Sequence, residues 1–289
     1  MSEQMSEQMS EQMSEQMSEQ ISTQVSTPIS KQKPIALTEP TARFSMRIRI
    51  TDRDVDFAKN LKLSALFSYF QDIASLHSEN LGASVRILSK ELGVAWILMK
   101  QRVEIVQMPQ LFDEIIIETW PGAPKALFDR DYYVKDLDGN ILVKSISVWV
   151  LMDIEKREIY RNIKDNPYLD YRRNLPLIEE RAIDAKMGKL RSPETLTHVY
   201  DKRIGYSDID YNRHVNNAIY CDHIMDTFGL DFLENHTINS IEINYQNEVH
   251  AGDTLELYIG EYDDTSTNFY IEGLNTHTVA TAFKAKVTF

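Results

Sequence analysis

The 289-residue chain is poor in cysteine, in positive charge and in long apolar runs, and each shortage excludes a class of protein. Its single cysteine, Cys221, cannot form a disulfide within the chain, so we expect a reducing compartment, the cytoplasm. The net charge of −13 argues against general nucleic-acid binding, which needs a basic surface. No apolar run is long enough to span a membrane, and the N-terminus lacks the apolar segment of a signal peptide.

The first 20 residues consist of the tetrapeptide MSEQ repeated five times, and a further polar stretch follows them. Such a tract has no face that can pack against a core. We therefore expect residues 1–40 to be a disordered low-complexity tail.

The full chain is 43% hydrophobic, enough to build a core. The part after the tail carries the same order of elements twice, which predicts an α+β fold built from two similar units. In each unit a strand precedes a helix, and four strands of an antiparallel sheet follow, so the helix covers one face of the sheet. The two units would form an internal pseudo-dimer, 41–160 and 197–289, joined by a charged, proline-containing linker at 161–196. The helices are expected at 63–80 and 217–228, and the strands at 43–51, 94–106, 113–120, 126–135, 141–152, 199–207, 238–248, 254–261, 267–273 and 278–289.

One stretch of the second unit, YSDIDYNRHVNNAIY (206–220), is unusually rich in hydrogen-bonding side chains just before the predicted helix. Its D-x-D resembles TDRDVDFAKN (51–60) of the first unit. On that comparison Asp208 and Asp210 correspond to Asp52 and Asp54, Asn212 to Asp56, and His214 to Ala58. A strand-end carboxylate, Glu248, likewise corresponds to Met108. The histidine, the asparagine and the glutamate thus occur in one unit only, which indicates one working site built by the second unit.

These residue types suit acyl transfer. The unpaired N–H groups at a helix start stabilise a developing oxyanion, so a carbonyl could dock at the start of the second helix. Asp210 or His214 can move a proton, Asn212 can orient water or a carbonyl, and Asn216 or its neighbour caps the helix. No second histidine or cysteine stands at ligand spacing from Asp210 and His214, which argues against a metal site. Cys221 falls inside the apolar helix pattern, which argues against a cysteine nucleophile.

At these residues the sequence resembles the acyl-ACP thioesterase family of plant plastids and bacteria. The resemblance is carried by DYNRHVNNAIY (210–220), by INYQNEV (243–249), and in the first unit by LKLSALFSYFQDIASLHSENLG (61–82) and WPGAPKALFDRDYYV (120–134). It implies two fused hotdog folds, hydrolysis of acyl-ACP to fatty acid and acyl carrier protein, and no cofactor. The family's catalytic set maps onto Asp210, Asn212, His214 and Glu248. Plant members often have a cysteine after the glutamate, where this chain has Val249, so attack by water is favoured over attack by a thiol.

The mechanism that follows has Glu248 or Asp210 activating water while His214 and Asn212 position the reacting groups. Because the second unit holds the chemistry, we expect the first unit to hold the acyl chain. The substrate-binding residues would then be Leu66, Phe70, Trp96 and, at the site itself, Asn216. Three alternatives remain at this point: an acyl-CoA thioesterase of the same fold, a hotdog dehydratase, and a non-catalytic acyl-binding module. Chain-length preference cannot be read from the residues, and a homodimer of the whole chain stays open.

Overall fold

The computed structural model describes residues 39–123, 127–161, 169, 175–262 and 267–289. The chain divides into two compact units, Met1–Thr38 and Glu39–Phe289. The first unit, and with it almost all of the expected tail, lies outside the described residues. Everything below concerns the second unit.

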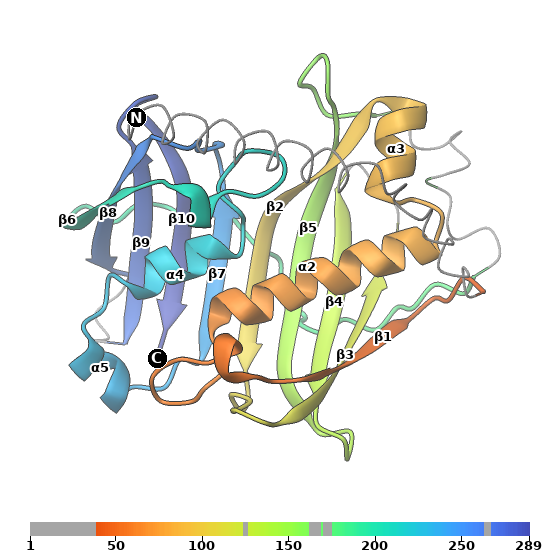
Figure 1. The fold of residues 1–289 in the computed structure, drawn as a ribbon, viewed down its shortest axis with the longest axis horizontal. Coiled ribbons are helices and arrows are strands. Elements are labelled where there is room, and N and C mark those ends of the chain that lie inside the picture. Colours follow the sequence, from red (N-terminus) through yellow and green to blue (C-terminus); the bar gives the residue numbers. More distant parts are fainter. Residues whose placement is uncertain (1–38, 124–126, 162–168, 170–174, 263–266) are drawn as a thin grey trace, which may run out of the picture. The chain divides into compact units, whose positions relative to one another are not determined.

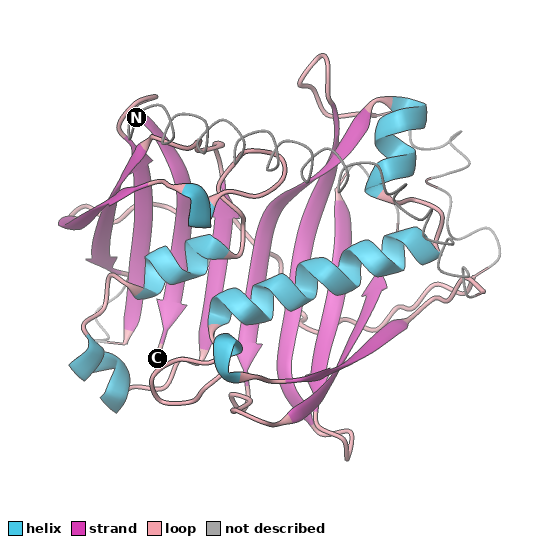
Figure 2. Ribbon diagram, viewed as in Figure 1, coloured by secondary structure: helices cyan, strands magenta, loops and turns pink. Residues whose placement is uncertain are grey.

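The described part keeps the predicted order of strands and main helices and adds two short helices, Val85–Leu92 and Leu230–Asn235 (Figure 2). Its strands arise where apolar and polar residues alternate. In both copies the ends of several elements differ from the predicted ones by a few residues. The first copy contains β1 Phe44–Arg49, α2 Leu63–Asn80, α3 Val85–Leu92, β2 Val94–Ile105, β3 Glu114–Pro121, β4 Phe128–Lys135 and β5 Ile141–Asp153. The second contains β6 Thr197–Arg203, α4 Ile219–Met225, α5 Leu230–Asn235, β7 Ser240–Tyr245, β8 Thr254–Glu261, β9 Asn268–Asn275 and β10 Ala280–Thr288. Short 3₁₀ turns, η1 Asp52–Asp54 and η2 Tyr206–Asp208, follow the first strand of each copy.

The ten strands of the described residues belong to one antiparallel sheet in the order β1-β3-β4-β5-β2-β7-β10-β9-β8-β6 (Figure 1). Read inward from either edge, the two copies give the same succession of strands. They meet at the pairing of β2 with β7, where Lys100 lies opposite Asn244 and Val103 opposite Ile241. The predicted pseudo-dimer is therefore a single continuous sheet, and the β2–β7 pairing is called the seam below.

The helices of both copies lie on one face of the sheet (Figure 1). The long helix α2 buries an apolar stripe, including Leu66, Phe67 and Phe70, in the main core. The helix expected over 217–228 is shorter than predicted, because α4 has only seven residues and α5 follows as a separate helix. The side chain of Asn216 accepts the amide of Ala218 at 2.9 Å, which keeps this segment in a turn and delays the helix start.

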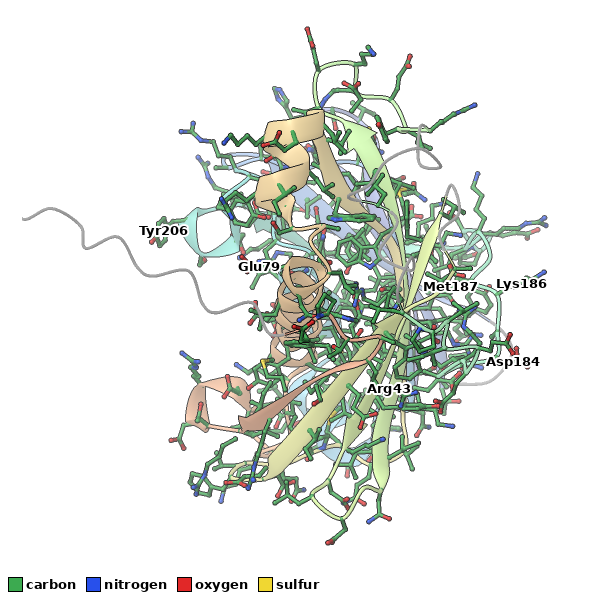
Figure 3. The ribbon with its side chains drawn as sticks, turned by 90° about the vertical axis from the view of Figure 1, so that its right-hand side faces the viewer. Arg43, Glu79, Asp184, Lys186, Met187 and Tyr206 are labelled. Atoms are coloured by element: carbon green, nitrogen blue, oxygen red, sulfur yellow. The ribbon has the colours of Figure 1, made fainter. Side chains whose placement is uncertain are left out.

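The described part of the linker crosses the opposite face of the sheet, where Figure 3 shows Asp184, Lys186 and Met187 on the far side from the helices and Tyr206. Ala182 and Ile183 pack with Trp120 and Tyr133 in a separate apolar cluster. The carbonyl of Gly188 accepts bonds from the side chains of Lys100 and Asn244, on the two strands of the seam, at 2.6 and 3.1 Å. The linker thus covers the second face as well as joining the copies.

Candidate active site

The turns that follow the first strand of each copy make matching hydrogen bonds. These bonds shift the predicted correspondence between the two copies by two residues. The Asp54 carboxylate accepts the Thr51 amide at 2.9 Å, and the Asp208 carboxylate accepts the Gly205 amide at 2.8 Å. Both aspartates are buried. Asp54 therefore corresponds to Asp208, and not to Asp210 as the sequence pattern indicated.

The same frame places Asp56 opposite Asp210. Oδ1 of Asp56 accepts the backbone amides of Ala58 and Asn60 at 2.8 and 2.9 Å. Oδ1 of Asp210 accepts those of Asn212 and His214 at 2.8 and 3.4 Å. An aspartate at this position thus shapes the loop in both copies, whereas the asparagine and histidine replace Ala58 and Asn60 and occur in the second copy only.

The histidine and the glutamate of the predicted set lie together. Nε2 of His214 is 3.5 Å from Oε2 of Glu248, and both side chains are partly exposed to solvent. The same oxygen accepts two bonds from Arg157, at 2.8 Å from Nη2 and 3.2 Å from Nη1. Arg157 belongs to the turn after β5 and has a left-handed φ of 55°, so the first copy supplies a cation to the carboxylate of the second.

A second histidine stands beside this pair. His250 forms a β-bridge with His214, and their rings pack edge to face with centroids 4.8 Å apart. Ligand atoms of His214, Glu248 and His250 all lie within 4.8 Å of one another. The bridge brings together His214 and His250, which are 36 positions apart, so local sequence spacing gives no sign of this cluster.

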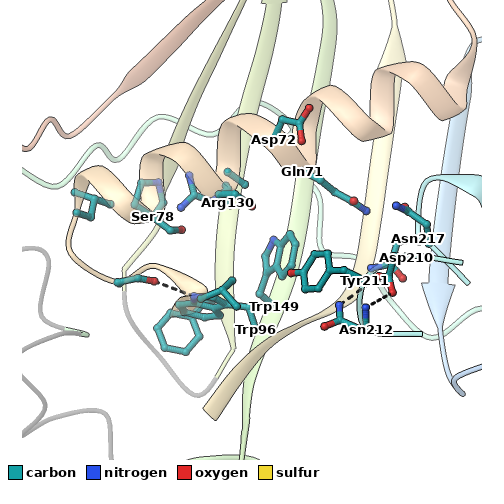
Figure 4. Close-up of a pocket in the computed structure, with 18 of the residues that line it drawn as sticks. Gln71, Asp72, Ser78, Trp96, Arg130, Trp149, Asp210, Tyr211, Asn212 and Asn217 are labelled. Atoms are coloured by element: carbon teal, nitrogen blue, oxygen red, sulfur yellow. Dashed lines mark hydrogen bonds between the residues drawn. The ribbon is translucent and has the colours of Figure 1, made fainter. Parts of the chain in front are cut away.

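A cavity of about 360 Å³ opens in the first copy and ends at the loop of the second (Figure 4). Aromatic side chains from the sheet form one wall, namely Trp96, Phe128 and Trp149. Polar side chains of α2 form another, namely Gln71, Asp72, Ser75 and Ser78. The second copy contributes Asp210, Tyr211, Asn212, Asn216 and Asn217. An elongated ligand in the first copy would thus present one end to the loop of the second.

The cavity includes some of the predicted substrate-binding residues and leaves out others. Trp96 and Asn216 line it, as predicted. Leu66 and Phe70 do not line it, because both are essentially fully buried in the main core under α2. Of the predicted catalytic set, Asp210 and Asn212 line the cavity, while His214 and Glu248 do not.

Burial raises the pKa of two side chains in this region, the carboxyl of Asp72 and the thiol of Cys221. Burial raises the pKa of the Asp72 carboxyl on the cavity wall, which favours a less charged wall. The thiol of Cys221 is fully buried in α4, and burial raises its pKa well above the ordinary value. A protonated, inaccessible thiol is a poor nucleophile, so the sequence-based argument against a cysteine mechanism holds.

Sequence reasoning missed Arg157, His250 and the aromatic wall at Phe128 and Trp149. His250 could have been found as Glu248 was, because its counterpart Gln110 is not a histidine. Arg157 carries no such signal, since its position depends on the left-handed turn after β5. Phe128 and Trp149 read as ordinary strand residues.

Two family models match the chain, the acyl-ACP thioesterase N-terminal domain over residues 41–168 and the acyl-ACP thioesterase C-terminal domain over residues 191–285. The chain belongs to the acyl-ACP thioesterase family. The resemblance stated from the motifs is confirmed.

Relatives and solved structures agree with this family at low sequence identity. A chloroplastic oleoyl-acyl carrier protein thioesterase of Coriandrum sativum is 24% identical over 263 residues, covering 85% of this chain and 70% of that protein. An acyl-ACP thioesterase of Bacteroides thetaiotaomicron has a similar structure, with a TM-score of 0.75 and 24% identity, covering 86% of this chain and 98% of that one. A 12:0-ACP thioesterase of Umbellularia californica gives a TM-score of 0.70 at 19% identity, covering 86% and 96%.

The chain spans between 53% and 70% of the length of the plant relatives that it matches. The structural likeness confirms the expected fold, two fused hotdog units of the α+β class. No helix in the described residues is both long and apolar enough to cross a membrane.

Proposed function

We propose that this acyl-ACP thioesterase family member hydrolyses the thioester of acyl-ACP and releases a free fatty acid. One observation carries the proposal: the loop with Asp210 and Asn212 closes one end of the first-copy cavity, and His214 of the same loop lies 3.5 Å from Glu248. An acyl chain in that cavity would deliver its carbonyl to these groups.

The carbonyl would be held by the amide side chains at the cavity end, Asn212, Asn216 and Asn217. This replaces the predicted docking at a helix start, because α4 is short and its first amides are already bonded. Asn216 accepts the Ala218 amide through Oδ1 and the Ile219 amide through its backbone carbonyl, both at 2.9 Å. Amide N–H groups aimed at the carbonyl oxygen would stabilise the oxyanion.

Glu248 is the better candidate for the general base. The oxygens of Asp210 accept three hydrogen bonds within its own loop, two from backbone amides and one from the Asn212 side chain at 3.3 Å. Those bonds commit Asp210 to shaping the loop. Glu248 contacts His214 and faces solvent, from which the attacking water comes. Water adds to the carbonyl carbon, the carbon–sulfur bond breaks, and the thiolate of the carrier takes up the proton that the base removed.

Arg157 acts as a positioning residue in this scheme. Its two bonds fix one oxygen of Glu248, the oxygen that also faces His214. The residue after the glutamate, Val249, is fully buried and carries no thiol. Attack by water is therefore the mechanism that these side chains support.

The decisive experiment measures free fatty acid and free thiol released from a panel of acyl-ACPs, with the matching acyl-CoAs in direct competition. Stoichiometric release of both products from acyl-ACP, lost in the Glu248→Gln variant, supports the proposal. Preference for acyl-CoA would make the protein an acyl-CoA thioesterase. Tight acyl binding without thiol release would make it a binding module. A cytoplasmic location and a homodimer remain predictions.

A further inference from the structure

Two imidazoles and a carboxylate meet on the solvent side of the proposed site. His214 lies on the loop after η2, whereas Glu248 and His250 follow β7. The Val215 amide donates to the Val249 carbonyl at 2.9 Å, which holds the two segments together. The ligand atoms of the three side chains are within 4.8 Å of one another, and the His214–Glu248 separation is 3.5 Å.

We propose that His214, Glu248 and His250 bind a divalent transition-metal ion, with Zn²⁺ the best match, and that the bound ion inhibits hydrolysis. Zn²⁺ takes imidazole nitrogen at about 2.0–2.1 Å and carboxylate oxygen at about 2.0–2.2 Å, in tetrahedral geometry. Neighbouring ligand atoms in such a site are about 3.4 Å apart, a separation that follows from those bond lengths. His214 and Glu248 already meet it, and His250 is exposed, so its ring can turn to complete the set. Water takes the fourth position.

Arg157 opposes the ion, because its guanidinium binds the same oxygen of Glu248 that the metal would take. Arg157 is itself mostly exposed and can swing into solvent. Competition between Arg157 and the ion for this oxygen makes metal binding reversible, and the charge of Arg157 sets the affinity for the ion. Removing that charge should tighten binding.

Metal binding rests on the geometry alone, whereas inhibition rests also on the proposed function. An ion held by His214 and Glu248 occupies the imidazole and the base that hydrolysis needs. The ion is then an inhibitor that a chelator removes.

The chain provides its own matched substitution for the test. In the first copy the bridge partner of Asn60 is Gln110, and the two side chains are hydrogen-bonded at 3.3 Å. His250→Gln therefore installs at this bridge a residue that the fold already accepts in the other copy. His198→Gln serves as the control, since His198 is an exposed histidine paired with Asp201 at 2.7 Å on β6.

Binding is measured by calorimetric titration of the full chain with Zn²⁺. We expect one ion per chain, affinity at least about tenfold weaker in His250→Gln, and unchanged affinity in His198→Gln. Arg157→Gln should bind Zn²⁺ several-fold more tightly. Absence of stoichiometric binding, or equal affinity in the wild type and His250→Gln, overturns the proposal.

Inhibition is measured as fatty acid released from acyl-ACP, because Zn²⁺ would also bind a liberated thiol. We expect Zn²⁺ to slow the wild type, a chelator to restore it, and His250→Gln to resist Zn²⁺, with each rate taken relative to the metal-free rate of the same protein. Equal inhibition of both proteins contradicts the inhibitory role. A chain that binds Zn²⁺ through His250 but hydrolyses no acyl-ACP would refute the proposed function and leave the metal site standing.

Discussion

Asp56 and Asp210 accept the same pair of backbone amides in the two copies, so together they separate the folding role of an aspartate from its chemical role. Only Asp210 lies at the cavity. Asp56 is therefore an internal control for the chemical role of Asp210.

Asp210→Asn should lower the rate of fatty acid release by about 10²-fold, because its carboxylate positions the Asn212 amide that would hold the carbonyl, while Asp56→Asn leaves the rate nearly unchanged. Both variants keep size and lose charge, so both should lose a similar, small amount of thermal stability. The measurements are kcat and the melting temperature of each variant. Equal losses of activity at Asp56 and Asp210 would show that the aspartate serves only the fold.

Arg157→Gln should lower kcat by roughly 10- to 100-fold with little change in KM, because Glu248 loses the contact that fixes its oxygen. Arg157→Lys should recover part of the rate. Lys156→Gln is the control, since Lys156 is an exposed neighbour whose ion pair is with Asp153 at 3.5 Å. A loss of the same size at Lys156 would mean that the turn, and not the guanidinium, matters.

The side chain of His77 makes the free energy of unfolding depend on pH. Burial, and then the charge of Arg130, lower its pKa from 6.5 to about 3, and Nδ1 accepts a bond from Arg130 at 3.1 Å. Between those values the unfolded chain binds more protons, so the stability contributed by neutral His77 is full above pH 6.5 and declines as the pH falls toward 3. From pH 7 to pH 5 this residue should cost about 2 kcal/mol of unfolding free energy. Denaturant titrations at both pH values should show a shallower decline in His77→Gln, and an unchanged slope would refute the assignment.

The residue types of the site were predictable, but their pairing was not. Asp52, Asp54 and Asp56 recur at every second position, so the D-x-D of the second copy fits the first in two registers. Only the backbone bonds of Asp54 and Asp208 decide between them. His250 and Arg157 reach the site through a bridge and a left-handed turn, and neither is visible in local spacing.

At the scale of elements, α2 was predictable because its apolar stripe runs through 18 residues, long enough to outweigh local turn preferences. In the segment before α4, local turn preferences outweigh the apolar pattern. An asparagine that bonds the backbone two residues ahead holds a turn, and the apolar pattern then yields one short helix and a separate α5. The shortness of α4 moves the expected carbonyl contacts from a helix end to amide side chains.

Because α2 forms one wall of the cavity, substitutions on α2 can test whether the cavity selects the length of the acyl chain. Ser78→Leu places an apolar side chain in the cavity and should shift the product profile toward shorter acids, by roughly 1–3 kcal/mol per misfitted methylene. Glu79→Leu is the control, because Glu79 is exposed on the same turn of the helix and does not line the cavity. Products are quantified by chain length. An unchanged profile in Ser78→Leu would move the acyl chain out of this cavity.

At the scale of the whole described unit, the seam makes one folding unit of two hotdog copies. Val103 and Ile241 face each other across it and are fully buried. The linker contacts both seam strands from the opposite face of the sheet. Neither copy can lose its inner strand without exposing the core of the other.

Ile241→Ala should therefore lower stability by about 2–5 kcal/mol and leave a single thermal transition. The measurement is scanning calorimetry, in which the calorimetric and van't Hoff enthalpies of the variant should agree. Two separated transitions, one for each copy, would show that the seam couples the copies weakly. A polar change on the same strand, Glu242→Gln, provides a comparison at a partly buried position that lies opposite Arg102 across the seam.

Because a covalent linker joins the two copies, dilution should affect this protein differently from a dimer of separate subunits. Two separate subunits that share a sheet part at low concentration, so their melting temperature and activity depend on how much protein is present. Here both copies belong to one chain, so their pairing at the seam does not depend on protein concentration. The cavity of one copy and the chemistry of the other should stay matched at any concentration, one complete site for each chain.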